Sequence, residues 1–216
     1  MWPVIPKRRV YVAHRGAHPF MYCDLDGSFE GTVGEEEIQP SVYYNLAKTP
    51  PEPRERCPWV HGLHVGPEDN LWVTDVGRHV VMKFSREGKL LLTLGIPDEP
   101  GVDARHFNQP TALFIAPSGF VYVADGYGNS RIVEFSPQGK YVFCWGKRGS
   151  GRGESHTPHA LAMDTRGNLH AADREHFRIQ VFDPDGQSLA AWPCRAEFSA
   201  IVIRGQFLTP GPDRKT

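Results

Sequence analysis

The stretch WVHGLHVGPEDNLWVTD, residues 59–75, is followed by two near-copies of itself. QPTALFIAPSGFVYVAD occupies residues 109–125 and TPHALAMDTRGNLHAAD occupies residues 157–173, and the three align without a gap. Each copy consists of an apolar run, a turn that contains Gly, and a second β-rich run that ends in Asp. A repeat of this kind cannot bury its apolar faces alone, so the copies must stack on one another.

Each copy continues with two further β-rich runs, separated by another turn that contains Gly. The third runs are VVMKFS, RIVEFS and RIQVFD, and the fourth are LLLTLG, YVFCWG and SLAAWP. Units of four short strands, repeated about every 50 residues, are typical of a β-propeller. The sequence therefore predicts a single all-β domain over residues 1–216, with full blades at about residues 59–96, 107–147 and 156–193.

The two ends of the chain carry incomplete copies. Residues 1–35 contain VYVAHRG, FMYCDLDG and SFEGTVG, which match the second, third and fourth strands of a blade. Residues 196–216 contain EFSAIVIRG, which matches an innermost strand and places Ser199 where the first full copy has His61. Residues 36–58, with their five prolines, are predicted to form a linker or an irregular outer strand.

Composition excludes several classes of partner. The 24 basic and 25 acidic residues give a formal net charge of −1, which argues against a nucleic-acid partner. No apolar run is long enough for a membrane span, and the basic start lacks the apolar stretch of a signal peptide, so we expect no membrane partner and a cytoplasmic location. The four cysteines are spaced too widely for a paired zinc motif, and we expect free thiols.

The third place of each copy holds His61, then Thr111, then His159. Equivalent places in a propeller lie around one axis, so two imidazoles at that place favour a shared metal ion. The alternative is that both only form hydrogen bonds at the mouth of the channel. Pairs three apart, such as His61 with His64, lie on opposite faces of a strand and chelate poorly.

Other residues recur with the repeat and are interpreted as structural. Asp75, Asp125 and Asp173 end the second strand of every full copy, where a short acidic side chain fixes a turn. Arg131 and Arg178 open the third strand of two copies and are read in the same way.

The units resemble NHL repeats, whose VADxxNxRIxxF pattern appears as VADGYGNSRIVEF and AADREHFRIQVF. Over residues 10 to about 190, the chain also resembles the peptidyl-α-hydroxyglycine α-amidating lyases in unbroken order. The segments that carry this likeness are HRG, HGL, WVTDVGRHVVMKF, HFNQPT, DGYGNSRIVEFSPQGK and PHALA. The resemblance implies a six-bladed propeller of which about four blades are present. A closed ring of four blades is the alternative.

The lyase family converts a peptide that ends in α-hydroxyglycine into a peptide amide and glyoxylate, with a zinc ion held by three histidines. By position, the resemblance makes His61 and His159 two zinc ligands and Tyr127 the catalytic tyrosine. It makes Arg15 and Arg174 active-site arginines and assigns the backbone carbonyl of Leu63 to a structural calcium.

The alternation of His61, Thr111, His159 and Ser199 fits that family arrangement, because alternate blades of a six-bladed ring lie about 120° apart. The third zinc histidine would belong to a further blade beyond Thr216, and the Met-Pro-His stretch of the family is absent.

The implied site also makes chemical sense. A tyrosine acts as a base at neutral pH only where cations stabilise its phenolate, so Tyr127 and Arg174 suit each other. Arg15 suits the terminal carboxylate of a peptide or a small α-hydroxyglycine-type substrate. Two alternatives stay open: a non-catalytic NHL propeller that binds a peptide or a protein on its face, and a related hydrolase or lyase in which water completes the zinc shell.

Overall fold

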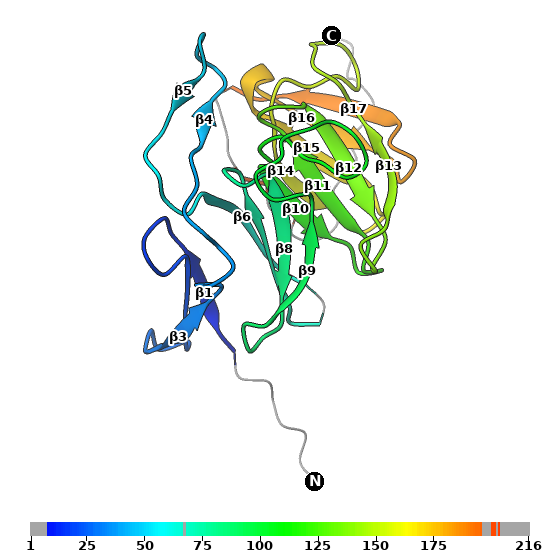
Figure 1. Cartoon of the computed structure of the whole chain (residues 1–216). Coiled ribbons are helices and arrows are strands. Elements are labelled where there is room, and N and C mark those ends of the chain that lie inside the picture. The colour runs from blue at the N-terminus through cyan, green and yellow to red at the C-terminus, as the bar shows by residue number, and fades with distance from the viewer. Residues whose placement is uncertain (1–7, 67, 196–199, 202, 204–216) are drawn as a thin grey trace.

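The computed structural model describes residues 8–66, 68–195, 200, 201 and 203. Within them lie three four-stranded antiparallel sheets whose strands follow one another in chain order (Figure 1). Their strands are β6 (Val60–Val65), β7 (Leu71–Asp75), β8 (Val80–Phe84) and β9 (Leu90–Leu94); β10 (Ala112–Ile115), β11 (Val121–Asp125), β12 (Arg131–Phe135) and β13 (Tyr141–Trp145); and β14 (Pro158–Met163), β15 (Leu169–Asp173), β16 (Arg178–Phe182) and β17 (Ser188–Pro193). The predicted all-β fold of propeller-type blades is confirmed.

The segment before the first full blade forms two smaller sheets. The strands β1 (Val10–Ala13), β2 (Phe20–Cys23) and β3 (Phe29–Val33) make a three-stranded antiparallel sheet, as the incomplete copy predicts. Residues 36–58 are more than a linker, because they contain a hairpin of β4 (Tyr44–Asn45) and β5 (Glu52–Pro53). Ser199 lies outside the described residues, so the strand predicted there and the closed four-bladed ring stay predictions.

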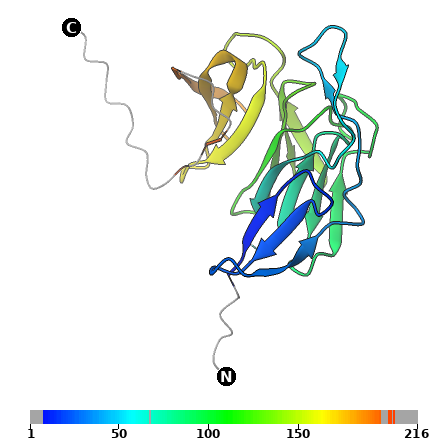
Figure 2. The ribbon, with the colours of Figure 1, turned by 90° about the vertical axis from the view of Figure 1, so that its left-hand side faces the viewer.

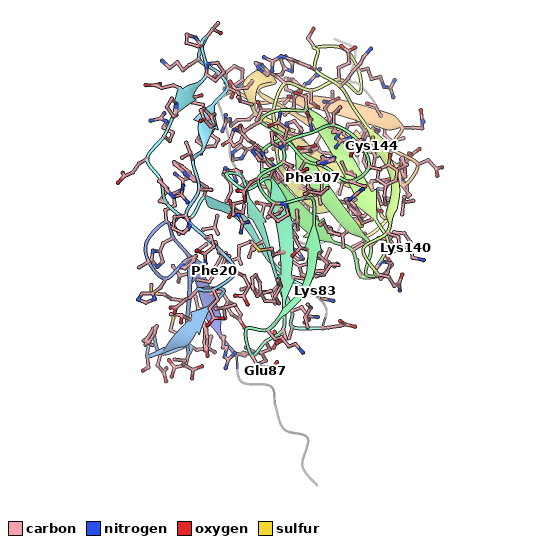
Figure 3. All side chains as sticks on the ribbon, viewed as in Figure 1. Phe20, Lys83, Glu87, Phe107, Lys140 and Cys144 are labelled. Carbon is pink, nitrogen blue, oxygen red and sulfur yellow. The ribbon has the colours of Figure 1, made fainter. Side chains whose placement is uncertain are left out.

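The sheets stack face to face, and their contact faces form the core. Along β7 the side chains alternate: Leu71 and Val73 face the sheet β1–β3, and Trp72 faces the sheet β10–β13. The middle strands β7 and β11 are buried throughout because a neighbouring sheet covers each of their faces. The middle strand β15 is also buried throughout, and Leu169 and Ala171 pack one of its faces against the sheet β10–β13. Figure 2 shows the blue sheet β1–β3 beside the green sheet β6–β9, and Figure 3 shows Phe20 and Phe107, two of the largest buried side chains.

The recurring aspartates fix the turn that follows the second strand, as expected. All three are fully buried, and Asp75 accepts the backbone N–H groups of Gly77 and Arg78 in that turn. Asp125 and Asp173 bind the turn through the side chains of Asn129 and His176, and their other carboxylate oxygen accepts a backbone N–H from the connection that enters the blade. Arg131 and Arg178 each form an ion pair of 2.9 Å with the aspartate of their own blade. Both arginines also donate to backbone carbonyl oxygens of the connection that enters their blade, so each pair joins that connection to the end of the second strand.

The described part of the chain contains almost no helix. The one helical element in the described part of the chain is the 3₁₀ turn η1 (Arg174–His176), and no helix there could span a membrane. All four cysteines are free thiols, as the spacing predicts.

Candidate active site

The two repeat histidines lie in irregular stretches of their strands. The pairing of β6 with β7 shifts register between Val60 and Leu63, and the pairing of β14 with β15 shifts between Pro158 and Leu161. His61 lies within the first of these irregular stretches and His159 within the second. A bulge re-aims the side chains that it carries. No such shift occurs in the pairing of β10 with β11, which follows Thr111.

Both imidazoles face one phenol oxygen. The Nε2 atom of His61 lies 3.1 Å from the Oη atom of Tyr127, and the Nε2 atom of His159 lies 3.1 Å from the same oxygen. The two imidazole rings meet edge to face, with centroids 4.8 Å apart. Side chains from three neighbouring blades therefore converge on one point, as the repeat positions predict for the histidines.

The protonation of His61 suits a metal ligand. Its Nδ1 atom donates a hydrogen bond of 2.6 Å to the carbonyl oxygen of Thr111, which leaves a lone pair on Nε2. Burial, helped by the neighbouring His159 and by the positive charges of Arg15 and Arg174, lowers the pKa of His61 to about 4. The imidazole is therefore neutral at pH 7.

Thr111, at the middle of the three equivalent places, connects the blades. Its hydroxyl donates to the carbonyl oxygen of Pro158, 2.7 Å away, and its carbonyl accepts from His61 and from the hydroxyl of Thr74. The Thr74 hydroxyl also accepts a hydrogen bond of 2.7 Å from the N–H of Gly62. Thr74 thus supports the bulge that carries His61, a role that the sequence did not reveal.

Tyr127 reaches the histidines because its turn lies against β14. A Cβ atom at Gly126 would lie 2.1 Å from the carbonyl oxygen of Pro158, so only glycine permits this approach. The backbone N–H of Tyr127 donates to the carbonyl oxygen of Gln109, which fixes the other side of the turn.

Arg174, at the start of η1, completes the surroundings of the phenol. Its Nη1 atom donates to the Oη atom of Tyr127 over 3.3 Å. Its Nε and Nη2 atoms bind Glu175 at 3.0 and 2.7 Å, which fixes the guanidinium group. Tyr127 and Arg174 therefore lie together, as the resemblance implies.

Arg15 approaches the same place from the incomplete blade. Its guanidinium group lies over the ring of Trp59, 4.4 Å from the centroid. A cavity of about 280 Å³ is lined by Arg15, Trp59, His61 and Tyr127, among others. The structure thus brings five of the six predicted site residues together, namely Arg15, His61, Tyr127, His159 and Arg174.

Leu63 is the sixth predicted residue, and its side chain belongs to the core. It packs against the apolar cluster between the sheets β1–β3 and β6–β9. Within residues 8–66 and 68–195, no group of three or more His, Cys, Asp or Glu side chains could hold a metal ion. The calcium assignment of Leu63 stays a prediction.

Two residues that flank the hairpin strands, Tyr43 and Arg54, also lie at the site but do not stand out in the sequence. Tyr43 contacts the ring of Tyr127, with centroids 5.9 Å apart, and contacts the ring of Trp59 at 4.9 Å. Arg54 lines the cavity described above. Two tyrosines and two arginines within a proline-rich stretch were the available signal, but the repeat pattern offers no equivalent position with which to compare them.

Known proteins resemble this chain over much of its length. Mouse peptidyl-glycine alpha-amidating monooxygenase is 39% identical over 230 residues, which cover 95% of this chain and 22% of the mouse protein. Peptidyl-alpha-hydroxyglycine alpha-amidating lyase 1 of Drosophila melanogaster is 42% identical over 56% of this chain and 25% of the fly protein. Human NHL repeat-containing protein 3 is 36% identical over 58% of this chain and 39% of the human protein. No family model matches the sequence.

The fold also resembles solved structures. A gluconolactonase from Xanthomonas campestris superposes with a TM-score of 0.63 over 89% of this chain and 61% of that protein, at 18% identity. This likeness concerns the fold alone. The chain spans less than a quarter of the length of the mouse relative. The chain is therefore homologous to parts of several proteins, among them an amidating monooxygenase, an amidating lyase and an NHL repeat-containing protein.

Proposed function

We propose that the protein is a metal-dependent lyase that cleaves an α-hydroxyglycine-type substrate into an amide and glyoxylate. The observation that carries this proposal is the convergence of the His61 and His159 Nε2 atoms on the Tyr127 hydroxyl, each at 3.1 Å. Two nitrogen ligands beside a phenol combine a place for a cation with a group that can move a proton.

The two imidazole nitrogens are of the ligand type that zinc takes in proteins. His61 and His159 would hold the ion through Nε2, and the hydrogen bond from His61 Nδ1 to the Thr111 carbonyl orients the ring, as outer partners of metal ligands do. A third imidazole, which the resemblance implies, is not among residues 1–216 at a matching motif. When bound, zinc polarises the substrate hydroxyl and lowers its pKa.

Tyr127 would act as the base. The proton of the substrate hydroxyl passes to the phenolate oxygen of Tyr127, and the O–H bonding pair forms the C=O bond of glyoxylate. The C–N bond breaks, its electron pair leaves with the amide nitrogen, and the proton that Tyr127 accepted passes to that nitrogen, which returns Tyr127 to its starting state. Arg174 supports the phenolate because its Nη1 atom already donates to that oxygen.

Arg15 would bind the substrate carboxylate. Its guanidinium group lines the cavity beside His61 and Tyr127 and lies over the ring of Trp59. A guanidinium group matches a carboxylate through two parallel hydrogen bonds. The scissile carbon would then lie between Arg15 and the Tyr127 hydroxyl.

A direct assay tests the proposal. Purified protein supplied with zinc should release glyoxylate from α-hydroxyhippurate, and Tyr127→Phe should lower the rate by about a hundredfold or more. His61→Ala should abolish the rate, whereas the matched control His64→Ala, three residues along the same strand, should retain it because His64 packs against Phe114 instead. If no glyoxylate appears, the alternative of a non-catalytic NHL module that binds a peptide or protein is favoured.

A further inference from the structure

The hairpin of β4 and β5 has no counterpart in the three full blades, yet it is firmly placed. Its two sides are joined by a hydrogen bond of 2.8 Å from the Arg54 N–H to the Tyr43 carbonyl. It is tied to the second full blade by the buried Gln109, whose Nε2 atom donates to the Tyr44 carbonyl over 2.8 Å. The Asn45 side chain accepts the N–H of Ala47 within the turn.

The hairpin supplies the wall between two cavities that flank Tyr127. The cavity of about 280 Å³ that contains Arg15 and His61 is also lined by Tyr43 and Arg54. A second cavity of about 180 Å³, on the side of Arg174, is lined by the same Tyr43 and Arg54. These two hairpin residues and Tyr127 are thus common to both cavities.

Positive charge is in excess around the hairpin and the two cavities. Arg174 is paired with Glu175, but neither the Arg15 nor the Arg54 side chain forms an ion pair with any residue that the structure describes. Burial raises the pKa of Tyr43, helped by Tyr127 and opposed by the positive charges of Arg174, Arg54 and Arg15. Two guanidinium groups without carboxylate partners, beside aromatic rings, suit an anionic group with an adjoining apolar part.

We propose that the hairpin is part of the substrate site: Arg54 binds the carboxylate of the substrate together with Arg15, and the Tyr43 ring covers the part of the substrate next to it. This inference deepens the proposed function and rests on it for the identity of the substrate. It makes Arg54 and Tyr43 specificity-determining residues contributed by a segment outside the repeats.

Kinetics with two substrates test the role of Arg54. For α-hydroxyhippurate, Arg54→Gln should raise KM about tenfold or more and leave kcat within about twofold, since a lost charge-assisted hydrogen bond weakens binding by this order. Arg54→Lys should recover part of the loss. For the methyl ester of the same substrate, which lacks the charge, Arg54→Gln should change nothing. The matched control is Arg56→Gln, because Arg56 lines a different cavity.

Binding of the unreactive analogue hippurate separates this inference from the proposed activity. By calorimetry, hippurate should bind the wild type and the Arg56→Gln variant equally, and Arg54→Gln should weaken binding about tenfold. This result without glyoxylate release would keep the anion site and reject the lyase. Glyoxylate release with unchanged KM and unchanged hippurate affinity in Arg54→Gln would reject the anion site alone.

Discussion

The first and second full blades hold the same buried aspartate in different ways. In the second blade, the Asp125 carboxylate pairs with Arg131 at 2.9 Å, and both side chains are almost completely buried. In the first blade the place of Arg131 is taken by Val80, and the Oδ2 atom of Asp75 has no hydrogen-bond partner in the described part of the chain. The third blade follows the second, through Asp173 and Arg178.

The arginine does more than neutralise the carboxylate. Arg131 donates to the carbonyl oxygens of Val102, Asp103 and His106, and so it holds down the connection that enters its blade. Where the arginine is missing, the entering connection is residues 36–58, which carries the hairpin. It is fixed by other contacts, among them the hydrogen bond from Trp59 Nε1 to the Ser41 carbonyl. The blade that departs from the repeat is thus the one that gained a wall for the candidate active site.

Removal of Arg131 should give the largest effect on stability. Arg131→Leu leaves the Asp125 carboxylate buried without its cation, so the free energy of unfolding should fall by about 3–5 kcal/mol. Denaturant unfolding measures it, with the exposed Arg166→Leu as control. Adding Asp125→Asn to the variant should recover part of the loss. A fall of less than about 1 kcal/mol would mean that the ion pair with Arg131 does not stabilise the second blade.

The stability that depends on Asp75 should change with pH. Burial raises the pKa of Asp75 from its ordinary value of 3.8 to about 6, against the N–H groups of Arg78 and Gly77. Between these two values the folded protein holds the proton more tightly than the unfolded chain. The contribution of Asp75 to the free energy of unfolding is therefore greatest below about pH 4. It falls by about 3 kcal/mol in total as the pH rises through 6.

Unfolding measured from pH 4 to 7 in the wild type and in Asp75→Asn tests this. The stability of the variant relative to the wild type should rise by that amount across the range. A constant difference between the two proteins would show that Asp75 has found a partner after all.

A smaller effect is expected at Thr74. The other full blades have Ala124 and Ala172 at this place, so the Thr74 hydroxyl is peculiar to the blade of His61. Thr74→Ala removes the hydrogen bond from the Gly62 N–H and should cost about 1 kcal/mol of stability. The ¹⁵N chemical shifts of the His61 ring should show a less uniform tautomer, and Thr74→Ser should restore the wild-type spectrum. Identical spectra in all three proteins would show that the Thr74 hydroxyl does not help to orient the His61 ring.

The repeats made much of this structure predictable, and their limits explain the rest. Equivalent places in aligned copies were enough to predict that His61 and His159 lie close together, because blades that stack on one another bring equivalent strands near each other. The bulges around these histidines depend on contacts such as Gly62 with Thr74, which are not visible in a strand pattern. The hairpin that carries Arg54 has only two short strands, and its place is set by Gln109, a residue far along the chain.

The central claim is that His61 and His159 share one cation beside Tyr127, and a calorimetric titration of the metal-free protein with Zn²⁺ tests it most directly. We predict one saturable site whose affinity falls at least tenfold in His61→Ala and in His159→Ala and is unchanged in His64→Ala. Absence of saturable binding, or a site that survives the loss of both histidines, would contradict the claim.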